Sequence, residues 1–492
     1  MIEPPVFLDA YRVLLLGSGA REHAMAQSIS ASPRCDRLWV HPGNAGTEAW
    51  SVDQPLDWRN IEQLAGFVQR NGIQLLVVGP EEPLVHGLVD QCRLHPLLQD
   101  LLIVGPNAEG ARLEGSKDFS KAFMQRHGIP TAGARTFRAE QREEAEAYLR
   151  QHAMPVVLKA DGLAAGKGVL ICDTPQEALE SLALFWTEQK FGEAGAKVLV
   201  EEFLEGIECS VFALCDGQDY VLLPPAKDYK RVGEGDTGLN TGGMGAVSPP
   251  PFATPELMRR IEERIVQPTL QGLQSEGVDY RGFLFVGLMK VGEEPMVIEY
   301  NVRMGDPETE AVMPRLQSDL LELLVAAASG KLSGMELMVD PRFAVTTVVC
   351  SGGYPGELRL GFPMTGLTGR DYTEDERLFH AGTKREGADC VNRGGRVVAA
   401  TVLDADLKEA ARRSLALAQE IRFEGAFCRK DLGQDLEQAH QPFGSKRVTT
   451  NIFGECATTD PAIHPRKPVG SPRRYRAPKG LVHAWNPWEP AK

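Results

Sequence analysis

Several familiar signals are missing from this chain of 492 residues. No apolar run approaches the roughly 20 residues that a membrane-spanning helix needs, so we expect no membrane segment. The first twelve residues contain two acidic residues and two prolines but no basic stretch before an apolar one, so we expect no signal peptide. The nine cysteines are scattered without a C-x-x-C pair, which argues against structural zinc and predicts a reducing, cytoplasmic compartment.

An excess of positive charge is also missing. The formal net charge is −14 at pH 7, which argues against a nucleic-acid binder for the chain as a whole. Only the last stretch, His440–Lys492, is basic, with nine Lys or Arg against three Asp or Glu, and it is rich in proline. We interpret it as an extended or disordered tail. A role in binding a partner or a nucleic acid is the alternative.

The composition is that of an ordinary globular protein, 43% hydrophobic and 24% charged. At roughly 100–200 residues per domain, the length predicts about three domains. Changes in pattern place an N-terminal α/β domain at 1–113, a central domain at 114–330, a C-terminal domain at 331–438 and the tail at 439–492.

The most informative stretch is Met296–Glu310, which begins as a strand of β-forming residues. Glu299 and Asn301 are two apart and therefore share one face of this strand. One carboxylate and one neutral carbonyl oxygen suit Mg²⁺ that also binds nucleotide phosphates. Arg303 adds a planar guanidinium suited to phosphate or carboxylate. The alternative is a strand edge with solvated charges.

The chain starts with a strand, a glycine-rich turn and a helix, at Arg12–Leu16, Gly17–His23 and Ala24–Ser30. Such a βα unit can offer backbone N–H groups to an anion. The dinucleotide-binding fingerprint is not met, because Glu22 stands where its third glycine belongs and His41 where its acidic residue belongs. We therefore do not expect a nicotinamide or flavin site.

Two further strands, Ile73–Val78 and Leu101–Val104, also end in glycine-containing turns. Glycines at successive carboxyl ends suit an open parallel sheet, where ligands bind outside those ends. Glu81, which follows the first of these strands, is a candidate ligand for an amine or a sugar hydroxyl. A loop carboxylate in water is the alternative.

A glycine-rich loop, Lys159–Gly168, lies between the expected strands Pro155–Lys159 and Val169–Cys172. It is not a Walker A loop, because its spacing is short and no Ser or Thr follows Lys167. Its glycines and lysines are nevertheless the parts of a phosphate-covering loop. A flexible surface loop is the alternative.

Local signals also predict individual elements elsewhere. Thr174-Pro175 reads as a helix start and Asp216-Gly217 as a hairpin turn. A helix is expected at Leu407–Ile421. The polar loop from Asp228 to Gly245 suggests a binding surface for a polar ligand.

Taken together, these motifs resemble the phosphoribosylamine–glycine ligase family of ATP-grasp enzymes over the chain to about residue 435. The matching stretches are Gly17–His23, His41–Thr47, Val78–Leu84, Glu114–Lys117, Lys159–Gly168, Glu201–Leu204, Asp228–Gly245 and Glu299–Glu310. The resemblance implies an α/β and α+β multidomain chain. Its parts are an N-terminal open parallel α/β sheet, a central ATP-grasp domain with a lid subdomain at about 130–195, and a small C-terminal mixed α/β domain.

The resemblance also implies a reaction, in which ATP, glycine and 5-phosphoribosylamine give glycinamide ribonucleotide, ADP and phosphate through a glycyl phosphate. Mg²⁺ or Mn²⁺ would be held by Glu299 and Asn301. ATP, the co-substrate, would contact Lys117, Lys159, Gly166, Lys167, Gly168, Glu201, Phe203, Leu204 and Glu208. The other substrates would contact Gly19, Glu81, Asp228, Lys230, Arg303, Gly305 and Asp306. Arg303, Lys159 and Asp306 would act at the reacting groups.

Two other functions stay open on the sequence. One is another ATP-grasp carboxylate–amine ligase or a biotin-dependent carboxylase, and the other is a non-catalytic nucleotide-binding regulator. Under all three functions we expect small-molecule ligands and no nucleic-acid or membrane partner. We expect the chain to be a monomer or a homodimer.

Overall fold

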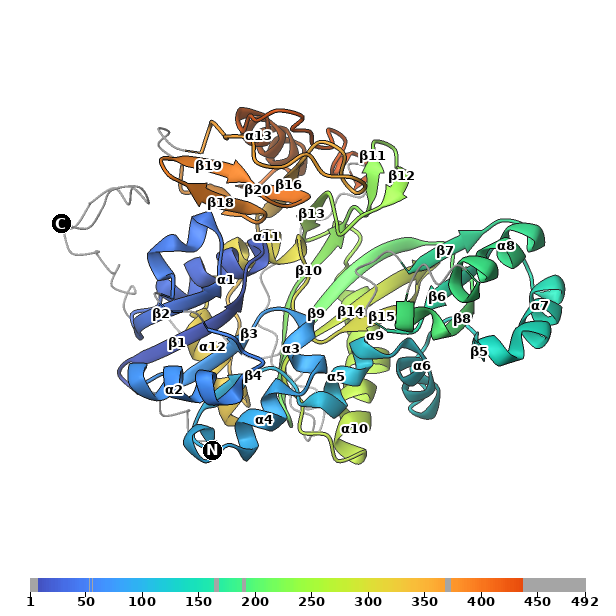
Figure 1. Cartoon of the computed structure of the whole chain (residues 1–492), viewed down its shortest axis with the longest axis horizontal. Coiled ribbons are helices and arrows are strands. Elements are labelled where there is room, and N and C mark those ends of the chain that lie inside the picture. Colours follow the sequence, from blue (N-terminus) through green and yellow to red (C-terminus); the bar gives the residue numbers. More distant parts are fainter. Residues whose placement is uncertain are drawn as a thin grey trace, which may run out of the picture.

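The computed structural model describes residues 8–436 except 53, 55, 163–167, 188–191 and 368–372. Its described part is built around two main sheets, one N-terminal and one larger. A smaller lid subdomain projects to one side (Figure 1). None of the described helices has both the length and the apolar character needed to cross a membrane.

The N-terminal part is an open sheet of four parallel strands, as the sequence predicts. Its order is β2-β1-β3-β4, so the first strand lies inside the sheet. The strands are β1 (Tyr11–Gly17), β2 (Cys35–Pro42), β3 (Leu75–Val78) and β4 (Leu102–Val104). The helices are α1 (Ala20–Ser30), α2 (Ile61–Asn71), α3 (Glu81–Val85), α4 (Leu88–Leu94) and α5 (Ala108–Gly115), with 3₁₀ turns η1 (Ala45–Trp50) and η2 (Pro96–Leu98).

Helix α1 begins four residues earlier than the predicted Ala24, at Ala20. The Glu22 carboxylate folds back and accepts a hydrogen bond from the Gly19 N–H at 2.7 Å, which caps the first turn. The same side chain fills the space beside Gly17, where a Cβ atom would collide with it. Glu22 thus occupies the turn that a dinucleotide-binding protein leaves open for a ligand.

The lid subdomain, residues 134–202, is an antiparallel sheet of order β5-β8-β6-β7 covered by two helices. Its elements are β5 (Ala134–Arg138), η3 (Ala139–Gln141), α7 (Arg142–Gln151), β6 (Val156–Ala160), β7 (Val169–Cys172), α8 (Pro175–Trp186), η4 (Gly192–Ala196) and β8 (Lys197–Glu202). Thr174 caps α8 through its hydroxyl, which accepts from the Glu177 N–H at 3.2 Å, so the predicted helix start is confirmed.

The large sheet has eight strands in the order β15-β14-β9-β10-β13-β16-β20-β17, all paired antiparallel. The strands are β9 (Ile207–Asp216), β10 (Tyr220–Asp228), β13 (Gly245–Ser248), β14 (Arg281–Val291), β15 (Glu294–Asn301), β16 (Phe343–Cys350), β17 (Glu376–His380) and β20 (Arg396–Asp404). The turn between β9 and β10 contains Gly217 at φ 95°, as the Asp-Gly signal predicts.

This arrangement joins the central and C-terminal parts of the chain in one continuous sheet. Strand β13 pairs with β10 on one side and with β16 on the other, so backbone hydrogen bonds cross the expected domain boundary. Two hairpins flank the sheet, β11 (Arg231–Gly233) with β12 (Thr237–Asn240) and β18 (Thr383–Glu386) with β19 (Asp389–Asn392). The C-terminal part of the chain therefore lies close to the loops of the central part.

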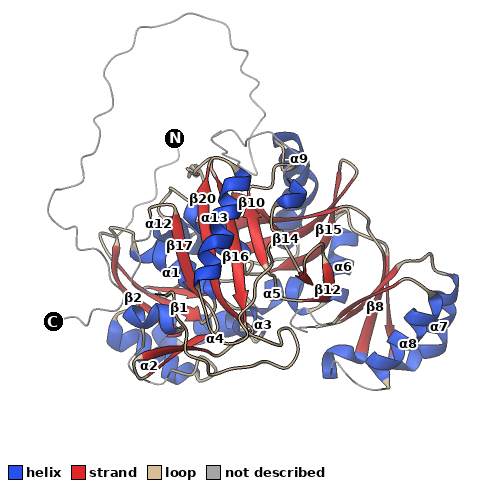
Figure 2. Ribbon diagram, turned by 90° about the horizontal axis from the view of Figure 1, so that it is seen from above, coloured by secondary structure: helices blue, strands red, loops and turns tan. Residues whose placement is uncertain are grey.

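The remaining helices cover the large sheet (Figure 2). They are α6 (Lys117–Arg126), α9 (Pro255–Ile261), the π-helical η5 (Glu262–Val266), α10 (Gln267–Ser275), α11 (Glu308–Val312), η6 (Met313–Arg315), α12 (Leu320–Ser329), α13 (Leu407–Glu420) and η7 (Gln434–Leu436). Helix α12 is apolar on nearly every face because it packs between β4 of the N-terminal sheet and β9 and β14 of the large one. It thereby fixes the two sheets relative to each other.

Candidate functional site

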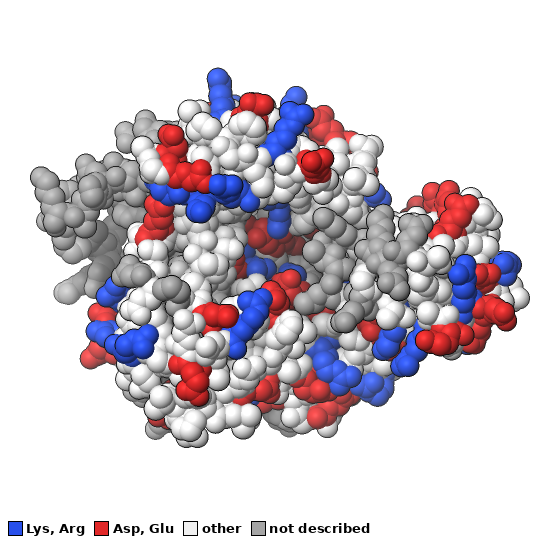
Figure 3. Space-filling model, viewed as in Figure 1, with Lys and Arg blue, Asp and Glu red and all other residues white. Residues whose placement is uncertain are grey.

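The charged motifs of the sequence meet in one network of side chains. Figure 3 shows that the face in view is hollowed near its centre, with Lys or Arg and Asp or Glu side chains inside the hollow. Strand β15, helix α11, the first turn of α1 and the lid subdomain contribute the residues described below. The site is therefore formed between parts of the chain, and no single domain contains it.

Glu299 and Asn301 lie near the end of β15, opposite Gly287 and Phe285 of β14. The register shifts just before them, so that Ile298 is not paired and its carbonyl accepts from the Lys159 Nζ of the lid at 3.4 Å. This irregularity connects the lid to the strand beside the two predicted cation ligands.

Positive charge surrounds Glu299. Burial acts to raise the pKa of its carboxyl, but Lys230, Lys159 and Lys117 outweigh burial and lower this pKa. The side chain is thus ionised at neutral pH. A carboxylate beside an amide carbonyl oxygen fits a hard cation that takes its other ligands from phosphate and water. Among the described residues, no group of three or more His, Cys, Asp or Glu side chains suited to a metal occurs.

The lysines form a second cluster around Glu201. Lys159 Nζ lies 2.6 Å from one Glu201 oxygen, and Lys121 Nζ lies 3.2 Å from the other. Lys117 donates to the Gly162 carbonyl at 2.9 Å, at the start of the glycine-rich loop. Burial lowers the pKa of Lys117 and of Lys121. The structure thus adds Lys121 to the site, a residue that the sequence marks only by its spacing of one helical turn from Lys117.

Of the other residues predicted to bind ATP, Phe203 is exposed and Leu204 is half-buried in the segment that joins β8 to β9. Gly168 is buried, and its carbonyl accepts from the Ala160 N–H at 2.8 Å. Gly166 and Lys167 lie outside the described residues.

Glu208 and Lys230, which the resemblance assigns to different substrates, form one ion pair at 2.5 Å. Burial acts to lower the pKa of Lys230, but Asp228, Glu208 and Glu299 raise it well above its ordinary value. Burial also raises the pKa of Asp228, against the effect of Lys230. Glu208, Asp228 and Lys230 therefore belong to the same charged network as the predicted cation ligand Glu299.

Arg303 connects β15 to the N-terminal sheet. Its guanidinium lies 2.7 Å from Glu114 Oε1 and 3.3 Å from Glu81 Oε2. Glu114 also accepts from the Val302 N–H at 2.8 Å, and burial raises its pKa to about 7. Burial acts to raise the pKa of Glu81 as well, but Arg303 and Arg21 lower it. The predicted Glu81 thus lies at the same place as Arg303, together with Glu114, which the sequence did not assign.

A residue in the C-terminal part of the chain forms an ion pair with Asp306. Arg396, the first residue of β20, lies 3.0 Å from Asp306 Oδ1 and donates to the Asp306 and Gly242 carbonyls at 2.6 and 2.8 Å. The second Asp306 oxygen faces Gly19, where a Cβ atom would lie only 2.9 Å away. Gly305 is closely packed too, against the Glu308 carboxyl. Arg396 is a further residue that the sequence did not identify, because no local motif surrounds it.

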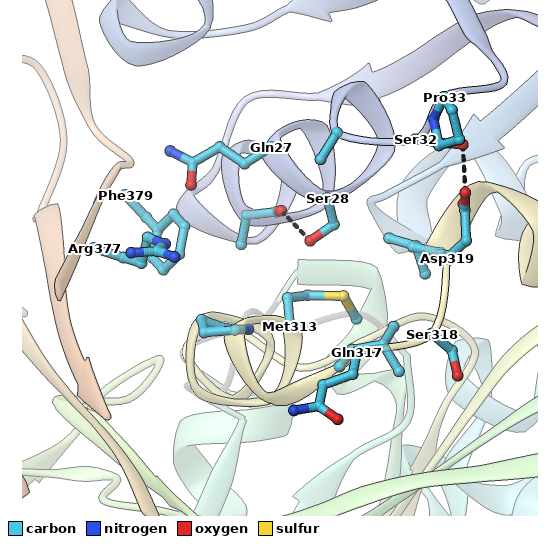
Figure 4. Close-up of a pocket in the computed structure, with 15 residues that line it drawn as sticks. Gln27, Ser28, Ser32, Pro33, Met313, Gln317, Ser318, Asp319, Arg377 and Phe379 are labelled. Atoms are coloured by element: carbon cyan, nitrogen blue, oxygen red, sulfur yellow. Dashed lines mark hydrogen bonds between the residues drawn. The ribbon is translucent and has the colours of Figure 1, made fainter. Parts of the chain in front are cut away.

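The cavity in Figure 4 lies elsewhere, between α1 and the segment 313–320. It has a volume of about 540 Å³ and is lined by α1, by residues 313–320 and by β17, with Gln27, Gln317 and Arg377 among its polar side chains. Arg377 donates to the carbonyls of Glu374 and Glu376 at 2.8 Å. None of the lysines or carboxylates described above lines it, so it is separate from the charged site.

Comparison with known proteins defines first the class and then the family. Residues 115–309 match the model described as "Phosphoribosylglycinamide synthetase, ATP-grasp (A) domain", which makes the chain an ATP-grasp protein. Residues 11–114 match the N domain and residues 344–435 the C domain of the same synthetase. The chain belongs to the phosphoribosylglycinamide synthetase family, also called phosphoribosylamine–glycine ligase.

The relatives agree with this assignment. The chain is 46% identical over 426 residues to a phosphoribosylamine–glycine ligase of Chlorobaculum tepidum, covering 86% of this chain and 99% of that protein. The corresponding protein of Vibrio cholerae is 45% identical, with coverage of 86% and 97%. The crystal structure of a phosphoribosylamine–glycine ligase from Thermotoga maritima matches with a TM-score of 0.72 at 34% identity, covering 85% of this chain and 99% of that one.

A biotin carboxylase domain of Hydrogenobacter thermophilus 2-oxoglutarate carboxylase also matches, with a TM-score of 0.65 at 16% identity, covering 86% of this chain and 92% of that one. At this identity the match shows a shared fold and nothing about substrates.

Proposed function

We propose that this chain is an ATP-dependent ligase that joins glycine to 5-phosphoribosylamine and forms glycinamide ribonucleotide, ADP and phosphate in purine biosynthesis. The observation that carries the proposal is the meeting of Glu299 with Lys117, Lys159 and Arg303 in one charged site. A carboxylate for a cation, lysines for phosphates and an arginine for a carboxylate are the groups that phosphoryl transfer to a carboxylate needs. Membership in the ligase family supports the same reaction.

In the first step, the glycine carboxylate attacks the γ-phosphate of ATP and gives glycyl phosphate and ADP. Glu299 and Asn301 would hold Mg²⁺ or Mn²⁺, which would neutralise phosphate charge when bound. Lys117 and Lys159 would neutralise further phosphate oxygens, and the loop containing Gly166, Lys167 and Gly168 would exclude water from the acyl phosphate. In this proposal Glu201, Phe203, Leu204 and Glu208 contact the nucleoside part of ATP.

Binding phosphate would alter the lysine cluster. Lys159 is paired with Glu201 at 2.6 Å, and Lys121 remains beside the same carboxylate at 3.2 Å. Lys121 can therefore go on balancing the charge of Glu201 when Lys159 turns toward a phosphate. The contacts of the lid strand that bears Lys159 would therefore change when the nucleotide binds.

In the second step, the sugar amine attacks the carbonyl carbon of glycyl phosphate, so that a C–N bond forms and the bond to phosphate breaks. Arg303 suits the glycine carboxylate and the acyl phosphate made from it, whereas the negative Asp306 suits the glycine ammonium group. The proposal also assigns Gly19 and Gly305 to this place, where a Cβ atom would meet the Asp306 and Glu308 carboxyls. Positioning of this kind supplies much of the catalysis when no covalent nucleophile takes part.

The proposal assigns Glu81, Asp228 and Lys230 to phosphoribosylamine. Glu81 lies beside Arg303, whereas Asp228 and Lys230 lie with Glu299, so the sugar substrate would extend from the loops of the N-terminal sheet toward the cation. We further propose that the protein works in the cytoplasm as a monomer or a homodimer.

The experiment that tests the proposal is an ADP-release assay with ATP, Mg²⁺, glycine and phosphoribosylamine made in situ from ribose 5-phosphate and ammonia. We expect ADP only when all components are present, with glycinamide ribonucleotide formed alongside. ADP release without glycine would indicate another ATP-grasp ligase. Tight ATP binding without turnover would favour the non-catalytic regulator.

We also expect the chain to keep full ligase activity when it is cut after Gln438. The matched family domains end at residue 435, and the aligned relatives cover 86% of the chain. The measurement compares kcat and KM of the full chain and of the truncated chain in the same assay. A truncated protein that is folded but inactive would assign the basic tail a part in the reaction.

A further inference from the structure

Glu310 occupies the junction of the three parts of the chain. It lies on the short helix α11, which packs against α1 of the N-terminal part, β10 and β13 of the central part and β16 and β20 of the C-terminal part. Its side chain is fully buried, at 0% exposure. The Thr401 hydroxyl donates to its backbone carbonyl at 3.0 Å, which anchors the helix to β20.

The Glu310 carboxyl has no donor among the described residues, and neither of its oxygens is hydrogen-bonded by one. Its polar neighbour is another carboxyl, that of Asp306, four residues earlier. Arg396, the cation that acts on Glu310, is engaged with Asp306 and with the Gly242 carbonyl. An ionised carboxylate buried without donors costs several kcal/mol. Two adjacent carboxyls avoid this cost by sharing a proton.

We propose that Glu310 is a neutral carboxylic acid that donates a hydrogen bond to ionised Asp306 and holds this carboxylate toward Gly19, where the glycine ammonium group binds. Glu310 is thus a positioning residue that acts through Asp306. The identity of the ligand rests on the proposed function, whereas the protonation of Glu310 does not.

The charged groups around Glu310 and Asp306 agree with a neutral Glu310 and an ionised Asp306. Burial raises the pKa of Glu310 well above its ordinary value and Asp306 adds to this rise, whereas Arg396 opposes it. For Asp306, burial also acts to raise the pKa, but Arg396 from β20 and Arg21 from α1 lower it, with Arg303 in the same direction. The exposed fraction of the Asp306 side chain is 17%, so the ionised member of the pair is the one that a substrate can reach.

The first test compares Glu310→Gln with Glu310→Ala. The glutamine amide can donate to Asp306 as the protonated acid does, so we expect its KM for glycine to stay within about twofold of the wild-type value. Alanine removes the donor, and we expect its KM for glycine to rise roughly tenfold or more. A Glu310→Gln variant with the same raised KM as Glu310→Ala would overturn the proposal, and so would a folded Glu310→Ala variant with a normal KM.

The second test needs no activity and stays available if Glu310→Ala does not fold. A raised folded-state pKa means that the native chain binds one more proton than the unfolded chain above the ordinary pKa of a glutamate. The stability gained from this proton is fully present below the unfolded pKa and declines as pH rises toward the folded pKa. Glu310→Gln lacks this proton, so its Tm relative to wild type should increase between pH 5 and pH 8.

A matched control is Glu22→Gln, also a fully buried glutamate near Asp306. Glu22 accepts from Arg21 Nε at 2.6 Å and from Gly19 N–H at 2.7 Å, so it has the donors that Glu310 lacks. At pH 5 we expect Glu22→Gln to lower Tm, whereas Glu310→Gln keeps it. A Tm difference between Glu310→Gln and wild type that does not change with pH would overturn the protonation of Glu310. Failure of the ligase assay with a positive pH result would overturn only the glycine assignment.

Discussion

Replacing Glu299 with glutamine is expected to lower turnover by roughly 100-fold or more while the protein stays folded. The side chain keeps its shape and one oxygen, but it loses the negative charge that a shared cation needs. The change also removes the negative charge of Glu299 that interacts with Lys117, Lys159 and Lys230. Phosphate charge would then be neutralised less well as it moves during phosphoryl transfer.

The measurement is kcat at several Mg²⁺ concentrations, with circular dichroism to confirm the fold. Glu294→Gln is a matched control, because Glu294 begins the same strand but is exposed and pairs with Arg260 and Arg264. A surface pair contributes about 0–1 kcal/mol, so this control should keep normal turnover. Unchanged activity of Glu299→Gln at limiting Mg²⁺ would refute the cation site.

Replacing Arg396 with methionine should both destabilise the protein and weaken glycine binding. The arginine joins β20 to Asp306 and to the loop at Gly242, and its side chain is only 22% exposed. Breaking a buried ion pair by removing one partner costs about 3 kcal/mol or more, because the remaining charge stays buried. Here Asp306 and Glu310 would lose the cation closest to them.

Urea unfolding and the KM for glycine give the two readouts for Arg396→Met. Arg412→Met is the matched control, because Arg412 on α13 is exposed and pairs within one helical turn with Glu409. We expect this control to leave the free energy of unfolding essentially unchanged. A normal glycine KM in Arg396→Met would mean that the C-terminal part of the chain does not help to position Asp306.

Much of this protein could be predicted from short stretches of sequence, because the relevant physical chemistry is local. Alternating β-formers place Glu299 and Asn301 on one strand, and Thr-Pro and Asp-Gly pairs fix a helix start and a hairpin turn. The parallel N-terminal sheet followed from glycines at successive strand ends. Glu81 and Arg303 were candidate ligands from their position and chemistry, whereas the assignment of each residue to a particular substrate came from a family resemblance and stays a prediction.

Only the tertiary structure determines which charged side chains lie next to one another. Arg396 is 90 residues from Asp306, and Glu114 is 189 residues from Arg303, so no local pattern connects them. The structure also decided that the C-terminal strands extend the central sheet, since strand pairing joins backbones regardless of their separation along the chain. The state of Glu310 depends on the same long-range packing. A glutamate is charged in water, and only complete burial beside Asp306 makes the neutral acid the stable form.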